Sequence, residues 1–194
     1  MPELTFDDVV RFHGHACPGL ALGYRVAELV LKRLGERAVD EELVAVVENN
    51  SCAVDAIQVM LGCTFGKGNL IFRDYGKQVY TVMTRPSGEG LRIAINWEPP
   101  PESAAEKEAW EKYRQGERSE EIARVVHDRK ARKMQAILDA SPEELFTVGE
   151  PREALPEAAR IYPSLTCERC DEKVMAPRTR QRDGKTVCIP CSDF

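Results

Sequence analysis

Two histidines and a cysteine occupy alternate positions in the segment HGHACPG, residues 13–19. They are His13, His15 and Cys17, and the chain has only three histidines in all. In extended backbone, side chains two positions apart point the same way, so this spacing predicts that all three face one pocket. Imidazole and thiolate are good ligands for zinc, nickel, iron or copper. Three interpretations are open: a metal site, a thiol with a histidine base, or a chance cluster on a loop.

Two more cysteines follow in the first third of the chain. Cys52 is expected at the start of a helix over 52–61, and Cys63 comes just after that helix. A helix N-terminus lowers the pKa of a thiol, which makes Cys52 a candidate ligand or nucleophile. Free cysteines are often simple core residues, and this explanation suits Cys63 best. Asp55 is a candidate cap, ligand or hydrogen-bond partner of a histidine.

Four cysteines near the C-terminus form two C-x2-C pairs separated by seventeen residues. They are Cys167, Cys170, Cys188 and Cys191. Each pair can aim two thiolates at one ion from a tight turn, and two pairs supply the four-sulfur shell that structural zinc prefers. So small a segment needs the metal to fold, and four thiolates leave no open position for catalysis. Two redox dithiols or an iron–sulfur site are the alternatives.

Composition and charge narrow the class of protein. The 194 residues suffice for one ordinary core and a small appendage, and the net charge of −5 disfavours nonspecific nucleic-acid binding. No apolar run approaches the ~18 residues that span a bilayer. The acidic N-terminal segment lacks a signal-peptide pattern, so we expect a cytoplasmic protein. There, seven cysteines indicate metal binding or thiol chemistry rather than disulfides.

The elements that position these residues follow from hydrophobic periodicity. The expected helices begin at Thr5, about Gly19, Cys52, Ser103 and Ser119. The expected strands are 43–48, 69–76, 78–85 and 91–98, with the last three joined as hairpins. This order predicts an α+β fold, with a mixed or antiparallel sheet covered by helices on one side.

Three segments are expected along the chain. Residues 1–148 form the α+β core domain that carries the His/Cys site. Residues 149–164 contain three prolines and are expected to form a linker. Residues 165–194 form the four-cysteine finger.

Two long motifs resemble a known family. FHGHACPGLALGYRVA at 12–27 and ENNSCAVDAIQVMLGCTFGKGNL at 48–70, together with the C-terminal four-cysteine finger, resemble the FmdE family, named for the E subunit of formylmethanofuran dehydrogenase. The stretch 102–145 carries no matching motif. The resemblance implies an α+β core, a treble-clef-like zinc finger and a homodimer.

The resemblance also implies a site in the core. It points to His15 and Cys17 first, then to Cys52 and Cys63, with His13 in support. In methanogens the family is associated with the molybdenum or tungsten enzyme that reduces carbon dioxide onto methanofuran, so subunits of that enzyme are candidate partners. Nothing in this chain resembles a pterin-binding or electron-transfer protein, and we do not expect it to perform the redox chemistry alone.

Three functions compete on this evidence. The leading one is a metal-binding accessory or subunit with structural zinc in the finger and a second transition metal in the core, with zinc, nickel and iron as candidates. The second is a thiol-dependent enzyme in which Cys17 or Cys52 is the nucleophile and His13 or His15 the base. The third is a module that binds a protein partner or, less readily, nucleic acid; membrane association is not expected.

Overall fold

The computed structural model describes residues 4–193, which fall into two compact units. The first, here called the core unit, ends at Ala158, and the second, the finger unit, begins at Ala159. Each unit has a hydrophobic cluster of its own. None of the described helices is both long and apolar enough to cross a membrane.

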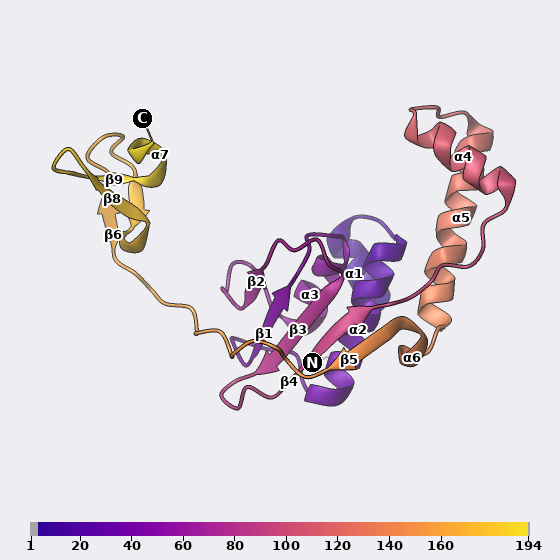
Figure 1. Cartoon of the computed structure of the whole chain (residues 1–194), viewed down its shortest axis with the longest axis horizontal. Helices are drawn as coiled ribbons and strands as arrows, with labels where there is room; N and C mark the ends of the chain where they lie inside the picture. Colours follow the sequence, from indigo (N-terminus) through magenta and orange to yellow (C-terminus); the bar gives the residue numbers. More distant parts are fainter. Residues whose placement is uncertain (1–3, 194) are drawn as a thin grey trace. The chain divides into compact units, whose positions relative to one another are not determined.

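Three helices cover one face of the sheet in the core unit (Figure 1). They are α1 (Phe6–His13), α2 (Pro18–Leu34) and α3 (Ala53–Leu61). Thr5 and Asp8 form a capping box at the start of α1. Pro18 occupies the first turn of α2, where its missing N–H costs nothing. The helix boundaries expected from the sequence are confirmed here to within a residue or so.

The sheet has five strands in the order β2-β1-β3-β4-β5. The strands are β1 (Leu43–Val47), β2 (Leu70–Phe72), β3 (Val79–Thr84), β4 (Gly90–Ile95) and β5 (Phe146–Gly149). β1 pairs in parallel with β2 and antiparallel with β3. The sheet is therefore mixed, and the expected α+β class is confirmed.

Two details of the sheet differ from the expectation. The segments 69–76 and 78–85 do not form a hairpin, because β1 lies between β2 and β3. α3 connects β1 to β2 as a crossover, and a crossover produces parallel pairing. The fifth strand was not expected; it pairs with the outer edge of β4, where Phe146 lies opposite Ile95.

The other face of the sheet is partly covered by the chain that follows β5. A small buried cluster on this face consists of Val44, Val46 and Met83. Leu155 packs on that cluster. The Arg85 guanidinium donates hydrogen bonds to the backbone carbonyls of Pro156 (2.7 Å) and Glu157 (3.1 Å). The first part of segment 149–164 is therefore attached to the core unit.

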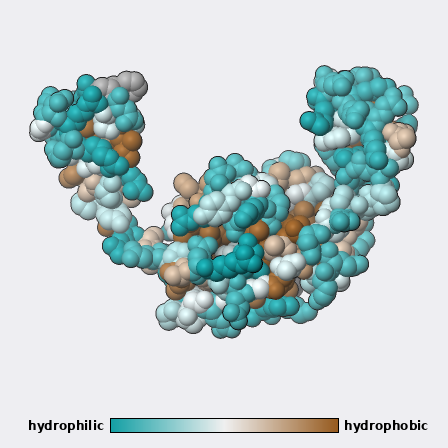
Figure 2. Space-filling view, in the orientation of Figure 1, coloured by the Kyte–Doolittle hydropathy of each residue, from teal (hydrophilic) through white to brown (hydrophobic). Residues whose placement is uncertain are grey.

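A helical hairpin is inserted between β4 and β5. It consists of α4 (Ala104–Arg114) and α5 (Glu120–Asp139), and α6 (Pro142–Leu145) then leads into β5. Figure 2 shows the hairpin as almost entirely hydrophilic on the face drawn. The end of α5 is fixed to α2, because Arg25 donates a hydrogen bond to the carbonyl of Ile137 (2.9 Å).

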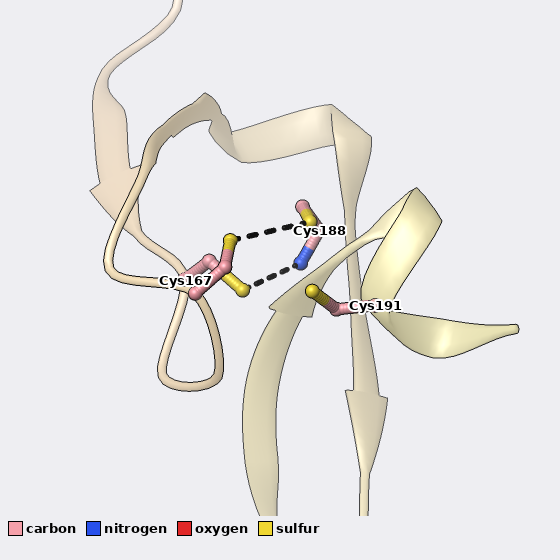
Figure 3. A group of neighbouring side chains, drawn as sticks. Cys167, Cys188 and Cys191 are labelled. Carbon is pink, nitrogen blue, oxygen red and sulfur yellow. Dashed lines mark hydrogen bonds between the residues drawn. The ribbon is translucent and has the colours of Figure 1, made fainter. Parts of the chain in front are cut away.

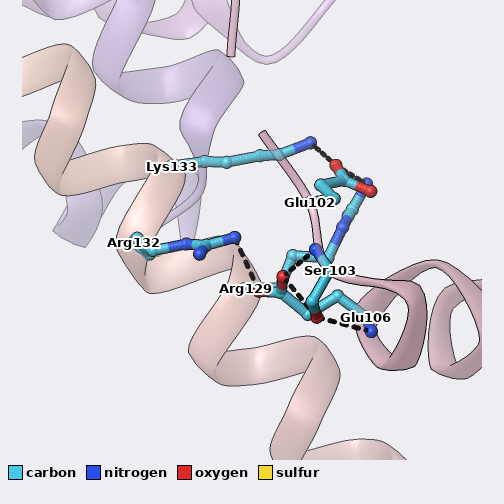
Figure 4. A network of polar contacts seen from close by, with 6 residues as sticks. All are labelled: Glu102, Ser103, Glu106, Arg129, Arg132 and Lys133. Atoms are coloured by element: carbon cyan, nitrogen blue, oxygen red, sulfur yellow. Dashed lines mark hydrogen bonds and ion pairs between the residues drawn. The ribbon is translucent and has the colours of Figure 1, made fainter. Parts of the chain in front are cut away.

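A network of charged side chains joins the start of α4 to α5 (Figure 4). Glu102 contacts both Lys133 and Arg129, the latter at 2.7 Å. These two cations hold the pKa of Glu102 down at about 2. Glu106 completes the expected capping box with Ser103.

The finger unit contains two antiparallel strand pairs. They are β6 (Ser164–Thr166) with β7 (Lys173–Met175), and β8 (Thr179–Arg182) with β9 (Lys185–Cys188). A 3-10 turn (Ala176–Arg178) precedes β8, and α7 (Ile189–Ser192) follows β9. Asp183 and Gly184 both have positive φ, as the two-residue turn between β8 and β9 requires.

Candidate metal centre

His13 is the last residue of α1, and its imidazole is held from one side by Asp55 on α3. The distance from His13 Nδ1 to Asp55 Oδ2 is 2.7 Å. An ionised carboxylate can only accept a hydrogen bond, so Nδ1 carries the proton and Nε2 keeps its lone pair. That Nε2 is buried and has no hydrogen-bond partner among the described residues. A buried acceptor without a partner is costly, and a metal ion would satisfy it.

Cys17 and Cys52 lie at the starts of α2 and α3. Cys17 is the N-cap of α2, and its sulfur accepts a hydrogen bond from the Leu20 N–H (3.4 Å). Cys52 is the N-cap of α3. The two helices meet closely, because a Cβ at Gly23 would lie 2.2 Å from the carbonyl oxygen of Ala53. Glycine at position 23 thus allows the contact that brings the two thiols together.

Three donor atoms converge at this place. The ligand nitrogen of His13 and the sulfurs of Cys17 and Cys52 lie within 4.8 Å of one another. One imidazole and two thiolates are a donor set that zinc and related transition metals accept. Three protein ligands leave a fourth tetrahedral position open for water or a substrate.

The pKa of Cys52 differs from the expectation. Burial raises the pKa of this thiol, and the neighbouring Cys17 raises it further. These two effects outweigh the helix N-terminus, so the expected lowering is wrong. A thiol of this kind is a poor free nucleophile but a normal metal ligand, because a bound cation deprotonates it outright.

His15 is not part of the group of three donor atoms. The expectation of extended backbone through 13–17 is wrong, because His13 ends a helix and Gly14 has a φ of +92°. The chain therefore turns between the two histidines. The His15 ring is exposed and lies against that of His13, with 4.5 Å between ring centroids.

Cys63 lies outside this group and inside the hydrophobic core. It is fully buried among apolar side chains, and burial raises the pKa of its thiol to about 12. Its placement as a possible core-site ligand does not agree with this position. The simpler explanation, a small hydrophobic core residue, agrees with it.

The four C-terminal cysteines form a second group of candidate ligands. The sulfurs of Cys167, Cys170, Cys188 and Cys191 lie within 4.8 Å of one another. Figure 3 shows Cys167, Cys188 and Cys191 pointing toward one another. The backbone N–H of Cys188 donates to the sulfur of Cys167 (3.3 Å), and this bond lowers the pKa of Cys167 to about 6. The finger and its cysteine cluster indicate structural zinc.

Sequence reasoning missed Gln58, which connects the His13 environment to its surroundings. The Gln58 amide donates to Asp55 Oδ1 (3.3 Å), on the side of the carboxylate that His13 does not use. The spacing of Asp55 and Gln58, three positions apart on one helix, is the only sequence feature that could have suggested this pair.

These features define a two-part protein with an α+β core, a His/Cys cluster and a four-cysteine finger. The model of the family described as "FmdE, Molybdenum formylmethanofuran dehydrogenase operon" matches residues 12–147, and the chain belongs to this family. Residues 160–192 match the prokaryotic dksA/traR C4-type zinc finger. The resemblance noted from the sequence is confirmed.

Two relatives extend the comparison. A "probable S-adenosyl-L-methionine-binding protein" of Archaeoglobus fulgidus is 37% identical over 191 residues, which cover 93% of this chain and 50% of that protein. The chain thus spans about half the length of this curated relative. The crystal structure of an FmdE-like protein of tungsten formylmethanofuran dehydrogenase type from Syntrophus aciditrophicus has a TM-score of 0.61 at 21% identity and covers 96% of this chain and 89% of that one. This second likeness concerns the fold.

Proposed function

We propose that the core unit binds a transition metal ion through His13, Cys17 and Cys52 and that this ion is the working site of the protein. The observation that carries the proposal is the buried Nε2 of His13, which lacks a partner among the described residues and lies beside two thiols. When bound, a zinc-like ion would supply Lewis-acid chemistry at its open position.

The residues of the chain have separate tasks in this proposal. Asp55 holds the proton of His13 at Nδ1 and so directs the Nε2 lone pair toward the metal. The Leu20 N–H supports the sulfur of Cys17. The four thiolates of the finger hold structural zinc and leave no open position there.

We further propose that the protein is a cytoplasmic homodimer that serves as an accessory or subunit of a molybdenum or tungsten enzyme. The family match supports this role. Copurification of a tagged chain with the enzyme's catalytic subunits, and sedimentation of the chain alone, test the two parts separately. Neither association nor dimer formation in those experiments would contradict this role.

Elemental analysis tests the metal proposal. Wild-type protein is expected to hold two metal equivalents per chain. Cys17→Ser is expected to lose the core metal and keep the finger zinc, whereas Cys188→Ser is expected to do the reverse. A wild-type content of one equivalent, lost only in Cys188→Ser, would remove the core site. A fast-reacting thiol at Cys17 or Cys52 without core metal would instead support the thiol-enzyme alternative.

A second candidate function is the binding of S-adenosylmethionine. The name of the Archaeoglobus relative and its 37% identity over 93% of this chain support it. A cavity of about 1090 Å³ in the core unit is large enough for such a molecule. Isothermal titration of the metal-loaded protein with S-adenosylmethionine tests this candidate, and absence of heat at millimolar ligand would reject it.

A further inference from the structure

The cavity of the core unit, here called the α2 pocket, has a volume of about 1090 Å³. It lies along α2 between α1, α3 and the loop that follows α2. Residues from these elements that line it include Phe12, Tyr24, Leu31, Lys32, Glu36 and Gln58. Small-molecule sites usually measure about 300–1000 Å³, so the α2 pocket is at the upper end of that range.

The α2 pocket has apolar and aromatic walls that extend to its mouth. Tyr24 and Leu31 lie seven positions apart on one face of α2. Phe12 and Val39 also line the pocket, yet their side chains are 60% and 74% exposed. Large apolar side chains left in water at one cavity mouth favour a ligand with an apolar or aromatic body.

Two charges of opposite sign in the pocket are unused. Lys32 and Glu36 form no hydrogen bond or ion pair through their side chains within residues 4–193. The other charged lining residues are occupied: Glu28 pairs with Arg25 (2.9 Å), and Arg37 donates to the carbonyl of Val59 (2.9 Å). A free ammonium and a free carboxylate beside an apolar wall match a zwitterion with a large apolar body.

The wall of the pocket is also connected to the proposed metal ligand. Gln58 lines the pocket and donates to Asp55, which in turn holds His13 at 2.7 Å. A ligand that moves the Gln58 amide would therefore disturb the carboxylate that orients His13. This chain of contacts places the pocket next to the chemistry rather than on an unrelated surface.

We infer that the α2 pocket is the binding site for an amino-acid derivative with an aromatic body, a ligand class to which adenosyl amino acids belong. Lys32 pairs with the ligand carboxylate and Glu36 with its ammonium group. Phe12 and Tyr24 contact the aromatic body. This inference rests on the second candidate function and assigns it a place and a recognition chemistry.

Calorimetric titration of the full chain tests the inference with two probes. S-adenosylmethionine carries the zwitterionic end, whereas 5′-methylthioadenosine keeps the adenosyl body without it. Lys32→Met and Glu36→Gln are each expected to weaken S-adenosylmethionine binding by about three- to fivefold, the range for an exposed ion pair. Both substitutions should leave 5′-methylthioadenosine binding unchanged. Lys107→Met, on exposed α4, is the matched control and should change neither ligand.

The outcomes separate the inference from the function on which it rests. Equal binding of S-adenosylmethionine by wild type, Lys32→Met and Glu36→Gln would overturn the inference and leave the second candidate function standing. A loss that affects both probes equally would show that the substitutions damage the fold rather than a charge contact, and it would also overturn the inference. No binding by wild type would reject the second candidate function itself.

Discussion

At the scale of single residues, the account depends on how His13 is held. Its imidazole has one nitrogen bonded to Asp55 and the other buried without a partner among the described residues. This arrangement is typical of a histidine that ligates a metal while a carboxylate fixes its tautomer. Cys17 and Cys52 supply the adjacent sulfurs.

Asp55→Asn should weaken metal binding at the core without unfolding the protein. The amide cannot provide the charged acceptor that fixes the His13 proton, and such partners are worth about 10- to 100-fold in metal affinity. Competition with a chromophoric chelator measures the affinity. Asp74→Asn, at an exposed position away from the cluster, is the control. An unchanged core affinity in Asp55→Asn would contradict the role given to this carboxylate.

Cys63 should remain unmodified in the folded protein. Burial raises its pKa to about 12, so the thiol is protonated at any ordinary pH and is also shielded from reagents. Alkylation with iodoacetamide at pH 8, followed by peptide mass spectrometry, should label this position only after denaturation. Rapid native labelling of Cys63 would show that the residue is accessible and would reopen its candidacy as a ligand.

At the scale of elements, the site depends on the close contact of α2 and α3. The starts of these helices carry Cys17 and Cys52, and the contact at Gly23 sets how near they come. The sequence predicted both helices and their N-termini correctly. It could not predict that α1 would end at His13 and turn the chain away from extended backbone.

Gly23→Ala should destabilise the core unit and spoil the core metal site. The added Cβ would lie 2.2 Å from the Ala53 carbonyl oxygen, so α2 and α3 must separate. Overpacking of this kind costs about 1–3 kcal/mol of unfolding free energy. Urea unfolding measures the loss. Gly66→Ala, where a Cβ meets nothing within 4 Å, is the control and should be close to wild type.

Acid should weaken the attachment of the α4–α5 hairpin through Glu102. Its folded pKa of about 2 is below the ordinary 4.5, so its stabilising contribution is present above pH 4.5 and is lost as the pH falls toward 2. Urea unfolding of wild type and Glu102→Gln should therefore differ most near pH 6 and converge near pH 2. A difference that is independent of pH would contradict this role for the charge.

At the scale of the whole molecule, sequence patterns predicted the α+β class, the four-cysteine finger and the family. They did not predict that β1 would separate β2 from β3, because strand order depends on packing between segments distant in sequence. Nor did they predict β5, whose four residues carry little pattern. The prolines of 149–164 suggested a free linker, but the Arg85 contacts attach its first part to the sheet.

The site was predicted to a similar degree. His13, Cys17 and Cys52 come from three segments, and residue type alone was enough to nominate them. His15 and Cys63 have the same chemistry but different positions, one exposed and one in the core. Only the turn at Gly14 and the burial of α3 separate these residues from the three that converge.

The central claim is that one histidine and two cysteines of the core hold a metal ion. X-ray absorption at the zinc edge tests it most directly, using full-length Cys170→Ser/Cys191→Ser protein reconstituted with one equivalent of zinc so that the intact core site dominates the spectrum. The account predicts two sulfur scatterers at about 2.3 Å, with nitrogen or oxygen at about 2.0–2.1 Å completing the shell. A shell without sulfur, or no zinc retained by this variant, would contradict it.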